Sequence, residues 1–414
     1  MVVVRPFKAV RPKDELAQKV ASFPYDVINS KEARNLAKND EYSFLHVVKP
    51  EIDLDENVNL YDESVYQKAK ENLYSMIAKN ILVQDEEPML YIYKQKMGDH
   101  EQYGLVSTVS ADEYNNNIIK KHEFTRKDKE DDRTKHVLTL NANTGPVFLT
   151  YRDNENINKI IESFVKNNTP NVDFVSEDGI GHTIWVINNK NITSELVELF
   201  KSIDYLYVAD GHHRSASAAR AKAEKMKNDP NYNEEKDYNF FLAVLFPATQ
   251  LMIMDYNRAL FTMNGLTKEE LFSKIEENFT FLNENTAKPS SSKRFGMYID
   301  GKWYQIEAKE GSYPADDPVK SLDVAILQDN LLAPILGIGD PRVDKKIDFV
   351  GGIRGTEELE KRVDSKECTL AFCLYPTDIN QLMSVADADK VMPPKSTWFE
   401  PKLRSGLFVN LLGE

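Results

Sequence analysis

Apolar residues follow two different patterns along this chain. In 64–80 they recur every three to four positions, which predicts an amphipathic helix, whereas 240–246 is an unbroken apolar run that predicts a buried strand ended by Pro247. Further helices are expected over 112–121, 215–227, 266–278, 321–336, 356–363 and 378–386, and further strands over 2–10, 89–95, 102–109, 147–151, 183–187, 203–209 and 408–412. Because strands and helices do not alternate regularly, the pattern predicts an α+β fold.

The length and the net charge of the chain limit the classes of protein to which it can belong. The 414 residues are enough for two or three domains. Asp and Glu outnumber Lys and Arg by 66 to 52, so the net charge is −14, and this acidic balance disfavours general binding to nucleic acid. No apolar run approaches the roughly 20 residues of a spanning helix, so no membrane segment is expected. The two cysteines, Cys368 and Cys373, do not suffice for a disulfide scaffold; we expect packed thiols and a cytoplasmic protein.

The most informative window is 203–220. An apolar strand ends just before Asp210-Gly211, and a helix rich in Ala, Lys and Glu begins a few residues later. The N–H groups at a helix start point outward with the positive end of the helix dipole, and glycine lets a phosphate come close. Side-chain donors stand at the same place: His212, His213, Arg214 and Ser215. The window predicts an anion site where Asp210 could also hold Mg²⁺. The alternative is an ordinary helix capped by Asp210, with two surface histidines.

Another segment only mimics a phosphate-binding loop. Residues 296–302 read Gly-Met-Tyr-Ile-Asp-Gly-Lys, but Trp303 stands where such a loop needs Ser or Thr for the metal. The flanking residues alternate as strands do. Asp300-Gly301 therefore predicts the turn of a β-hairpin.

Two polar segments are candidates for a substrate-binding loop. The run 122–133 mixes charges of both signs, which is typical of a solvated surface, but its cations could also hold a carboxylate or phosphate and Glu123 an ammonium group. The candidates there are His122, Glu123, Thr125 and Arg126. Lys395, Ser396 and Thr397 follow two prolines, so they form either a rigid substrate loop or a structural turn. Asp26 is interpreted as a turn or cap carboxylate that could line the same pocket.

The run Asp210-Gly211-His212-His213-Arg214, followed by a helix of small residues, resembles the second box of the ParB/sulfiredoxin superfamily, in which a Gly-x-x-Arg turn binds nucleotide phosphates. The sequence of this run is also similar to the corresponding motif of the free serine kinases, which phosphorylate L-serine to O-phospho-L-serine. The resemblance implies that Asp210 acts on the metal and the nucleophile. In those kinases, a Glu shortly after an N-terminal Pro acts as the catalytic base. Asp14 stands at that place here and Glu15 follows it, so either carboxylate could be the base.

The whole chain resembles the larger branch of this superfamily. Four segments of that branch are present in order: Pro24-Tyr25-Asp26-Val27, His122-Glu123-Phe124-Thr125, the DGHHR box at 210–214, and Met-Pro-Pro-Lys-Ser-Thr at 392–397. The compact kinases match only the pieces near 2–25 and 203–250. The resemblance implies a nucleotide-binding core made of 1–30 and 203–250, an inserted α+β region at 31–202 and a C-terminal α+β region at 251–414.

The expected reaction is phosphoryl transfer from ATP or ADP to a small hydroxyl substrate, with L-serine as first choice. Residues 211–215 would cradle the phosphates, Asp210 would hold Mg²⁺ or the hydroxyl, and Asp14 or Glu15 would take the proton. One rival is a ParB-like nucleotide switch that binds DNA, which the net charge and the lack of a recognisable helix-turn-helix disfavour. Another is a nucleotide- or metabolite-binding protein without chemistry. The expected partners are a nucleotide and a small molecule, and a homodimer stays open.

Overall fold

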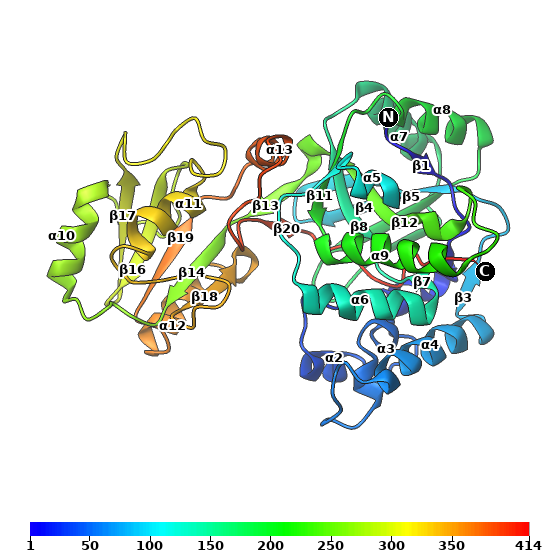
Figure 1. Cartoon of the computed structure of the whole chain (residues 1–414), viewed down its shortest axis with the longest axis horizontal. Coiled ribbons are helices and arrows are strands. Elements are labelled where there is room, and N and C mark those ends of the chain that lie inside the picture. The colour runs from blue at the N-terminus through cyan, green and yellow to red at the C-terminus, as the bar shows by residue number, and fades with distance from the viewer. Residues whose placement is uncertain (414) are drawn as a thin grey trace. The chain divides into compact units, whose positions relative to one another are not determined.

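The computed structural model describes residues 1–413 and divides into two compact units (Figure 1). The first unit comprises residues 1–251 and the C-terminal tail from residue 401 onward. The second unit comprises residues 252–400. The fold is mixed α/β. Within the described residues, no helix combines the length and the apolar content needed to cross a membrane.

The first unit is built on a mixed sheet, which has nine strands in the part of the chain described. Its strands are β1 (Val4–Arg5), β4 (Leu90–Met97), β5 (His100–Ser110), β6 (Ile119–Lys120), β8 (Val147–Tyr151), β9 (Val172–Val175), β10 (Gly181–Ile187), β11 (Leu206–Asp210) and β12 (Phe240–Pro247). The order is β6-β11-β8-β12-β5-β4-β10-β9, with β1 beside β5. The pairs β6–β11 and β8–β12 are parallel, and the other pairs are antiparallel. Short ladders join β2 (Val10–Pro12) to β3 (Leu82–Gln84) and β7 (Ala142–Asn143) to β21 (Asn410–Leu411).

Helices pack on this sheet and on the short ladder of β2 and β3 near the N-terminus. They are α1 (Ala17–Val20), α2 (Ser30–Leu36), α3 (Leu45–Val48), α4 (Glu63–Ala78), α5 (Ala111–Asn115), α6 (Lys127–Leu140), α7 (Glu155–Asn167), α8 (Lys190–Phe200) and α9 (His212–Asn228). The main core lies between the sheet and apolar side chains of α7, α8 and α9. A second core joins α2, α3 and α4 to β2 and β3. Figure 1 shows α6 running alongside α9, and the two helices pack together.

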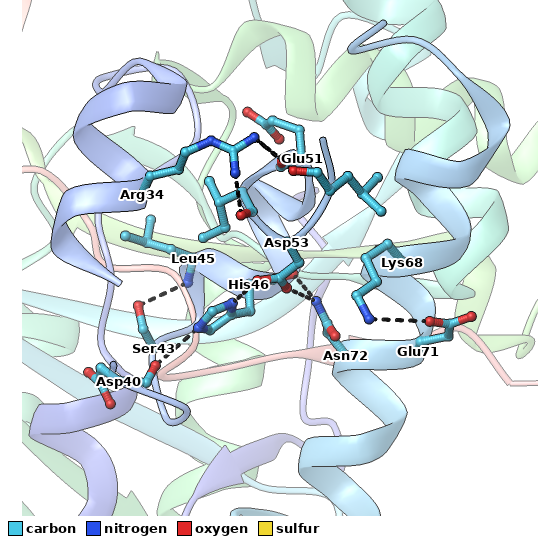
Figure 2. A network of polar contacts seen from close by, with 12 residues as sticks. Arg34, Asp40, Ser43, Leu45, His46, Glu51, Asp53, Lys68, Glu71 and Asn72 are labelled. Atoms are coloured by element: carbon cyan, nitrogen blue, oxygen red, sulfur yellow. Dashed lines mark hydrogen bonds and ion pairs between the residues drawn. The ribbon is translucent and has the colours of Figure 1, made fainter. Parts of the chain in front are cut away.

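A polar network holds α2, α3 and α4 around the 3₁₀ turn Pro50–Asp53 (Figure 2). His46 bonds through Nδ1 to Asp53 Oδ1 at 2.8 Å and through Nε2 to the Asp40 carbonyl oxygen at 3.0 Å. Asn72 donates to Asp53 Oδ2 at 2.7 Å. The guanidinium of Arg34 donates to three backbone carbonyls of the same turn region, those of Glu51, Ile52 and Leu54.

Several expectations are confirmed and three need correction. The strand at 240–246 is β12, which is buried and paired on both edges; this explains its continuous apolar run. The strand expected at 2–10 is broken, because only Phe7 bridges Met89 between β1 and β2. The helix expected at 112–121 stops at Asn115, and β6 follows. The charged run 122–133 is not one loop, since α6 begins at Lys127.

The division expected within residues 1–250 stays a prediction. Strand β8, from the expected insertion, lies between β11 and β12, and β5, also from the insertion, pairs with both β12 and β1. Both expected pieces therefore contribute to one sheet, and 1–251 belongs to one compact unit. The expected C-terminal region reached 414, whereas the tail from 401 groups with the first unit.

The second unit has an antiparallel sheet of its own. Its order is β15 (Phe279–Phe281), β17 (Lys302–Ala308), β16 (Arg294–Ile299), β19 (Leu370–Leu374), β14 (Tyr256–Leu260) and β18 (Ile347–Gly351), and β13 (Met252–Met254) pairs separately with β20 (Trp398–Glu400). Its helices are α10 (Lys268–Asn278), α11 (Asp323–Leu327), α12 (Glu357–Asp364) and α13 (Ile379–Asp387). Asp300 and Gly301 join β16 to β17 with positive φ angles of 51° and 74°, which confirms the predicted hairpin. Cys368 and Cys373 are buried free thiols, as expected.

Candidate functional site

The candidate site is built on the turn between β11 and α9. Strand β11 is buried over Leu206–Ala209 and delivers Asp210 at its carboxyl end. Gly211 then adopts φ 102° and ψ 32°, a left-handed conformation that residues with a Cβ rarely take, and α9 starts at the next residue. The first-turn N–H groups of α9 have no partner inside the helix. The strand–glycine–helix arrangement predicted from the sequence is therefore present.

Two cations meet the Asp210 carboxylate. Lys402 Nζ lies 3.4 Å and Arg214 Nη2 3.6 Å from the same oxygen, Oδ2. Burial by itself would raise the pKa of the Asp210 carboxyl, but Lys402 and Arg214 outweigh it and hold that pKa well below its usual range. Asp210 is thus ionised at neutral pH, with both cations at the same carboxylate oxygen.

Arg214 folds back against the turn. Its Nη1 donates to the Pro146 carbonyl oxygen, and a Cβ placed on Gly211 would lie only 3.0 Å from its Nε. Its side chain is 11% exposed, and Nε is buried without a hydrogen-bond partner. Burial would lower the pKa of the guanidinium, but Asp26 and then Asp210 raise it above its usual value. Asp26, from the Pro-Tyr-Asp-Val segment, therefore belongs to the electrostatic surroundings of this site.

The segment 122–126 docks on the first turn of α9. The rings of His122 and His212 meet edge to face, with centroids 4.4 Å apart and planes at 88°. Farther along, the Arg126 backbone N–H donates to His213 Nε2 at 3.0 Å. Glu123 Oε2 lies 3.9 Å from His212 Nδ1, beyond hydrogen-bond distance. The structure thus brings the two histidine-containing motifs together, although about 90 residues separate them.

Other predicted polar groups in the two motifs are occupied by local contacts. The Ser215 hydroxyl is fully buried and donates to the Gly211 carbonyl oxygen at 3.2 Å. Thr125 Oγ1 donates to Glu130, and the exposed Arg126 side chain pairs with Asp128. A phosphate at this place would therefore meet backbone N–H groups and Arg214 before any hydroxyl of the box.

A cavity of about 40 Å³ opens beside Arg214. Tyr25, Arg133, Gly145 and Ser405 are among its other lining residues. The Arg133 guanidinium lies 4.2 Å from the centre of the Tyr25 ring. Such a volume holds one or a few waters, or one small polar group. The cavity joins the Pro-Tyr-Asp-Val segment, the box and the tail of the first unit.

Asp14 and Glu15 lie in a 3₁₀ turn near the N-terminus, Asp14–Leu16, and both are exposed. Asp14 Oδ1 accepts from Arg11 Nη1 at 3.1 Å. Among the contacts of residues 1–413, no hydrogen bond or ion pair joins either carboxylate to the 210–215 box. Their role as the base stays a prediction.

Lys395, Ser396 and Thr397 belong to the second unit and are described there by themselves. The Lys395 carbonyl oxygen accepts from Arg258 Nη2 at 3.1 Å, and the Ser396 carbonyl oxygen from Thr377 at 2.8 Å. The Ser396 hydroxyl donates to the Pro393 carbonyl oxygen at 2.6 Å. In this unit the segment acts as a structural turn, and its role as a substrate loop stays a prediction.

Sequence reasoning missed Lys402. It lies 192 positions from Asp210 and belongs to a short irregular tail, so no local period marks it. The only signal is a pair of cations, Lys402 and Arg404, in a segment that returns to the first unit. Within the described residues, no group of three or more His, Cys, Asp or Glu side chains is arranged to hold a metal ion.

Comparison with known proteins gives a family and a set of distant structures. Residues 4–325 match the family described as "Protein of unknown function (DUF1015)", so the chain belongs to that family. No curated protein matches the sequence. A free serine kinase in complex with AMP is 13% identical, covers 71% of this chain and 86% of its own, and gives a TM-score of 0.35. A conserved hypothetical protein from Pyrococcus furiosus is 13% identical, covers 74% of this chain and 95% of its own, and gives a TM-score of 0.36.

Proposed function

We propose that this member of the DUF1015 family is a phosphotransferase that moves a phosphoryl group from ATP or ADP to a small hydroxyl substrate, with L-serine as first choice. The observation that carries the proposal is the turn 210–214. It combines a left-handed glycine, an uncapped helix start and a buried arginine next to an ionised carboxylate. These are the parts that phosphoryl transfer needs: donors for phosphate oxygens and a carboxylate at the reacting end.

The donor set fits a magnesium ion that arrives with the nucleotide. Mg²⁺ usually takes one or two carboxylates, with phosphate oxygens and waters as its other ligands, so a protein cage is not required. Asp210 would supply one such carboxylate, and Lys402 and Arg214 lie 3.4 and 3.6 Å from its Oδ2. When bound, the ion would neutralise charge on the phosphates. Arg214 and the N–H groups of residues 212–214 would orient the phosphates.

The base is proposed to be Asp14 or Glu15, as the resemblance to the kinases implies. The variants Asp14→Asn and Glu15→Gln separate the two. The base variant should lose most turnover with little change in nucleotide affinity, and the other should stay near wild type. Because both side chains are exposed, neither substitution disturbs the core.

Phosphorus NMR tests the function directly. Purified protein with Mg-ATP or Mg-ADP is incubated with L-serine, other amino acids and small alcohols, and we expect phosphoserine with serine. If none of the hydroxyl compounds gives a phosphorylated product, yet the nucleotide affinity changes when DNA is added, the phosphotransferase is wrong and a nucleotide switch takes its place.

Asp210→Asn should separate chemistry from binding. The amide keeps the shape of the side chain but removes the charge, so turnover should fall by at least ~100-fold while nucleotide affinity in calorimetry stays within a few fold. Arg214→Ala should first weaken nucleotide binding, by about tenfold or more, because it removes a charge-assisted phosphate contact. Equal effects of the two variants on affinity and turnover would contradict the assigned roles.

A further inference from the structure

A second cavity, of about 200 Å³, lies at the end of β12 in the first unit. It shares no lining residue with the cavity beside Arg214, and the roles proposed for the 210–215 box do not use it. Its walls come from β5, α7, the end of β12 and the 3₁₀ turn Ala248–Gln250. The lining residues are Tyr103, Asn158, Ile161, Glu162, Val165, Lys166, Pro247 and Gln250.

The cavity exists because two neighbouring strands separate. Strand β12 pairs with β5 as far as Leu245, opposite Leu105, and then continues beside β8 alone to Pro247. The N–H of Tyr103, two residues before Leu105, is accepted by the side-chain oxygen of Gln250 at 2.8 Å instead of by a strand. Residues of α7 line the space that this separation opens. The cavity is therefore a consequence of the pairing in the sheet.

Contacts within the protein hold the walls of this cavity in place. Asp153 Oδ1 accepts from the Thr249 N–H at 3.0 Å, which fixes the 3₁₀ turn. The Tyr103 hydroxyl donates to Glu101 Oε2 at 3.1 Å, and Lys94 Nζ lies 5.3 Å from the centre of the Tyr103 ring. Walls that are already fixed lose little freedom when a ligand binds, so the cavity is organised in advance for binding.

The apolar part of the lining determines the body of the ligand. The ring of Tyr103 and the side chains of Ile161, Val165 and Pro247 all face this space. In another protein, an engineered apolar cavity of about 150 Å³ holds a benzene ring. A cavity of about 200 Å³ is therefore large enough for one ring or one branched aliphatic chain.

Two opposite charges stand beside these apolar walls. Glu162 and Lys166 both line the cavity, lie one helical turn apart on α7 and are exposed. Glu followed by Lys four residues later is the favourable order for an ion pair on a helix. The same helix has such a pair in Glu155 and Lys159, which meet at 3.1 Å. Within residues 1–413, however, neither Glu162 nor Lys166 has a hydrogen bond or an ion pair, so both charges stay available to a ligand.

We propose that this cavity binds a zwitterionic α-amino acid with an apolar side chain. The side chain of the ligand lies against Tyr103 and Val165, its ammonium group meets Glu162, and its carboxylate meets Lys166. Both charged groups of an amino acid are attached to one carbon atom, which suits opposite charges whose Cβ atoms lie about 5–6 Å apart on a helix. A ligand with a single charge would leave Glu162 or Lys166 unmatched. This binding site is separate from the proposed phosphoryl-transfer site and goes beyond that function.

Calorimetry of the full chain tests the chemical class of the ligand. The probe is L-phenylalanine, and its two controls are 2-phenylethylamine, which lacks the carboxylate, and 3-phenylpropionate, which lacks the ammonium group. L-Phenylalanine should bind at least ~10-fold more tightly than either control, because each lost group removes a charge-assisted contact. Methyl NMR gives the place of binding: L-phenylalanine should shift the methyl resonances of Ile161 and Val165. L-Serine, which has both charges but no apolar side chain, should not shift them.

The variants Glu162→Gln and Lys166→Met test the two charged contacts separately. Each should weaken the binding of L-phenylalanine at least ~10-fold and leave the thermal midpoint of the free protein unchanged, because both side chains are exposed. The matched controls are Glu155→Gln and Lys159→Met, which change the same residue types on the same helix away from the cavity. Their affinity for L-phenylalanine should stay within about twofold of wild type.

Three outcomes would overturn the proposal. They are wild-type affinity for L-phenylalanine in both cavity variants, a control ligand with one charge that binds as tightly as L-phenylalanine, and methyl resonances of Ile161 and Val165 that L-phenylalanine does not shift. None of these measurements depends on turnover. A protein that forms no phosphorylated product would therefore contradict the phosphotransferase and leave this binding site intact.

Discussion

At the scale of single residues, Gly211 carries the strictest requirement of the site. It has φ 102°, and any Cβ there would lie 3.0 Å from Arg214 Nε and 3.1 Å from its Cζ. The guanidinium is itself fixed by Pro146 and Asp210, so it cannot move aside freely. Glycine thus allows both the backbone conformation and the close approach of the arginine.

Gly211→Ala should therefore destabilise the protein by about 1–3 kcal/mol and weaken nucleotide binding, because it displaces Arg214. Gly98→Ala is the matched control: Gly98 also has a positive φ, of 59°, but no atom lies within 4 Å of its added Cβ. Chemical denaturation and calorimetry of both variants measure the two effects. A Gly98 variant that loses as much nucleotide affinity as the Gly211 variant would contradict the local role of the arginine.

At the scale of elements, His46 links α3 to the 50–53 turn and, through Asp53, to α4 (Figure 2). Both ring nitrogens face acceptors, a carboxylate and a carbonyl, so the contacts are complete only when both nitrogens carry a proton. The hydrogen bond to Asp53 raises the pKa of His46, although burial opposes it. His46 stabilises the folded state most when it is charged.

The sign of the pH effect follows from that raised pKa. The contribution of His46 is fully present below the unfolded pKa of about 6.5 and is lost as the pH rises through the higher folded pKa. His46→Gln should therefore lower the thermal midpoint most at pH 5.5 and least at pH 8.5. A deficit that grows with pH would contradict the charged state of the ring.

The sequence predicts elements whose signals are local and misses those decided by distant contacts. The apolar run of β12, the Ala-rich α9 and the Asp300-Gly301 turn all follow from neighbouring residues. The break between β1 and β2 does not, because it depends on the bridge from Phe7 to Met89. At the site, the turn 210–214 was predicted from its own residues. The docking of His122 and the pairing of Lys402 were not, since both partners lie far along the chain.

At the scale of the whole molecule, the two units have separate cores and separate sheets. Separate cores commonly unfold as separate cooperative transitions. Each unit also contains a buried arginine. Arg404 pairs with Asp178 and lies 4.1 Å from the centre of the Phe23 ring, whereas Arg258 donates to two backbone carbonyls and lies 4.7 Å from the centre of the Phe349 ring.

Calorimetry should therefore show two transitions. Arg404→Met should lower the midpoint of one of them by a few degrees, because it removes the pairing with the partly exposed Asp178 and the contact with the Phe23 ring. Arg258→Met should lower the midpoint of the other, since it removes the hydrogen bonds of the buried guanidinium to the Tyr256 and Lys395 carbonyls. A single transition that both variants lower equally would show that the units unfold together.

The return of the tail to the first unit has a consequence for synthesis of the chain. Asp210 leaves the ribosome 192 residues before Lys402, and all of 252–400 is made in between. At about 5–20 residues per second, that interval lasts roughly 10–40 seconds. During it the nascent first unit carries Asp210 without its lysine and β7 without β21. Asp210 can therefore pair with Lys402 only after the second unit has been translated. A message truncated before codon 402 encodes a first unit in which this pair cannot form.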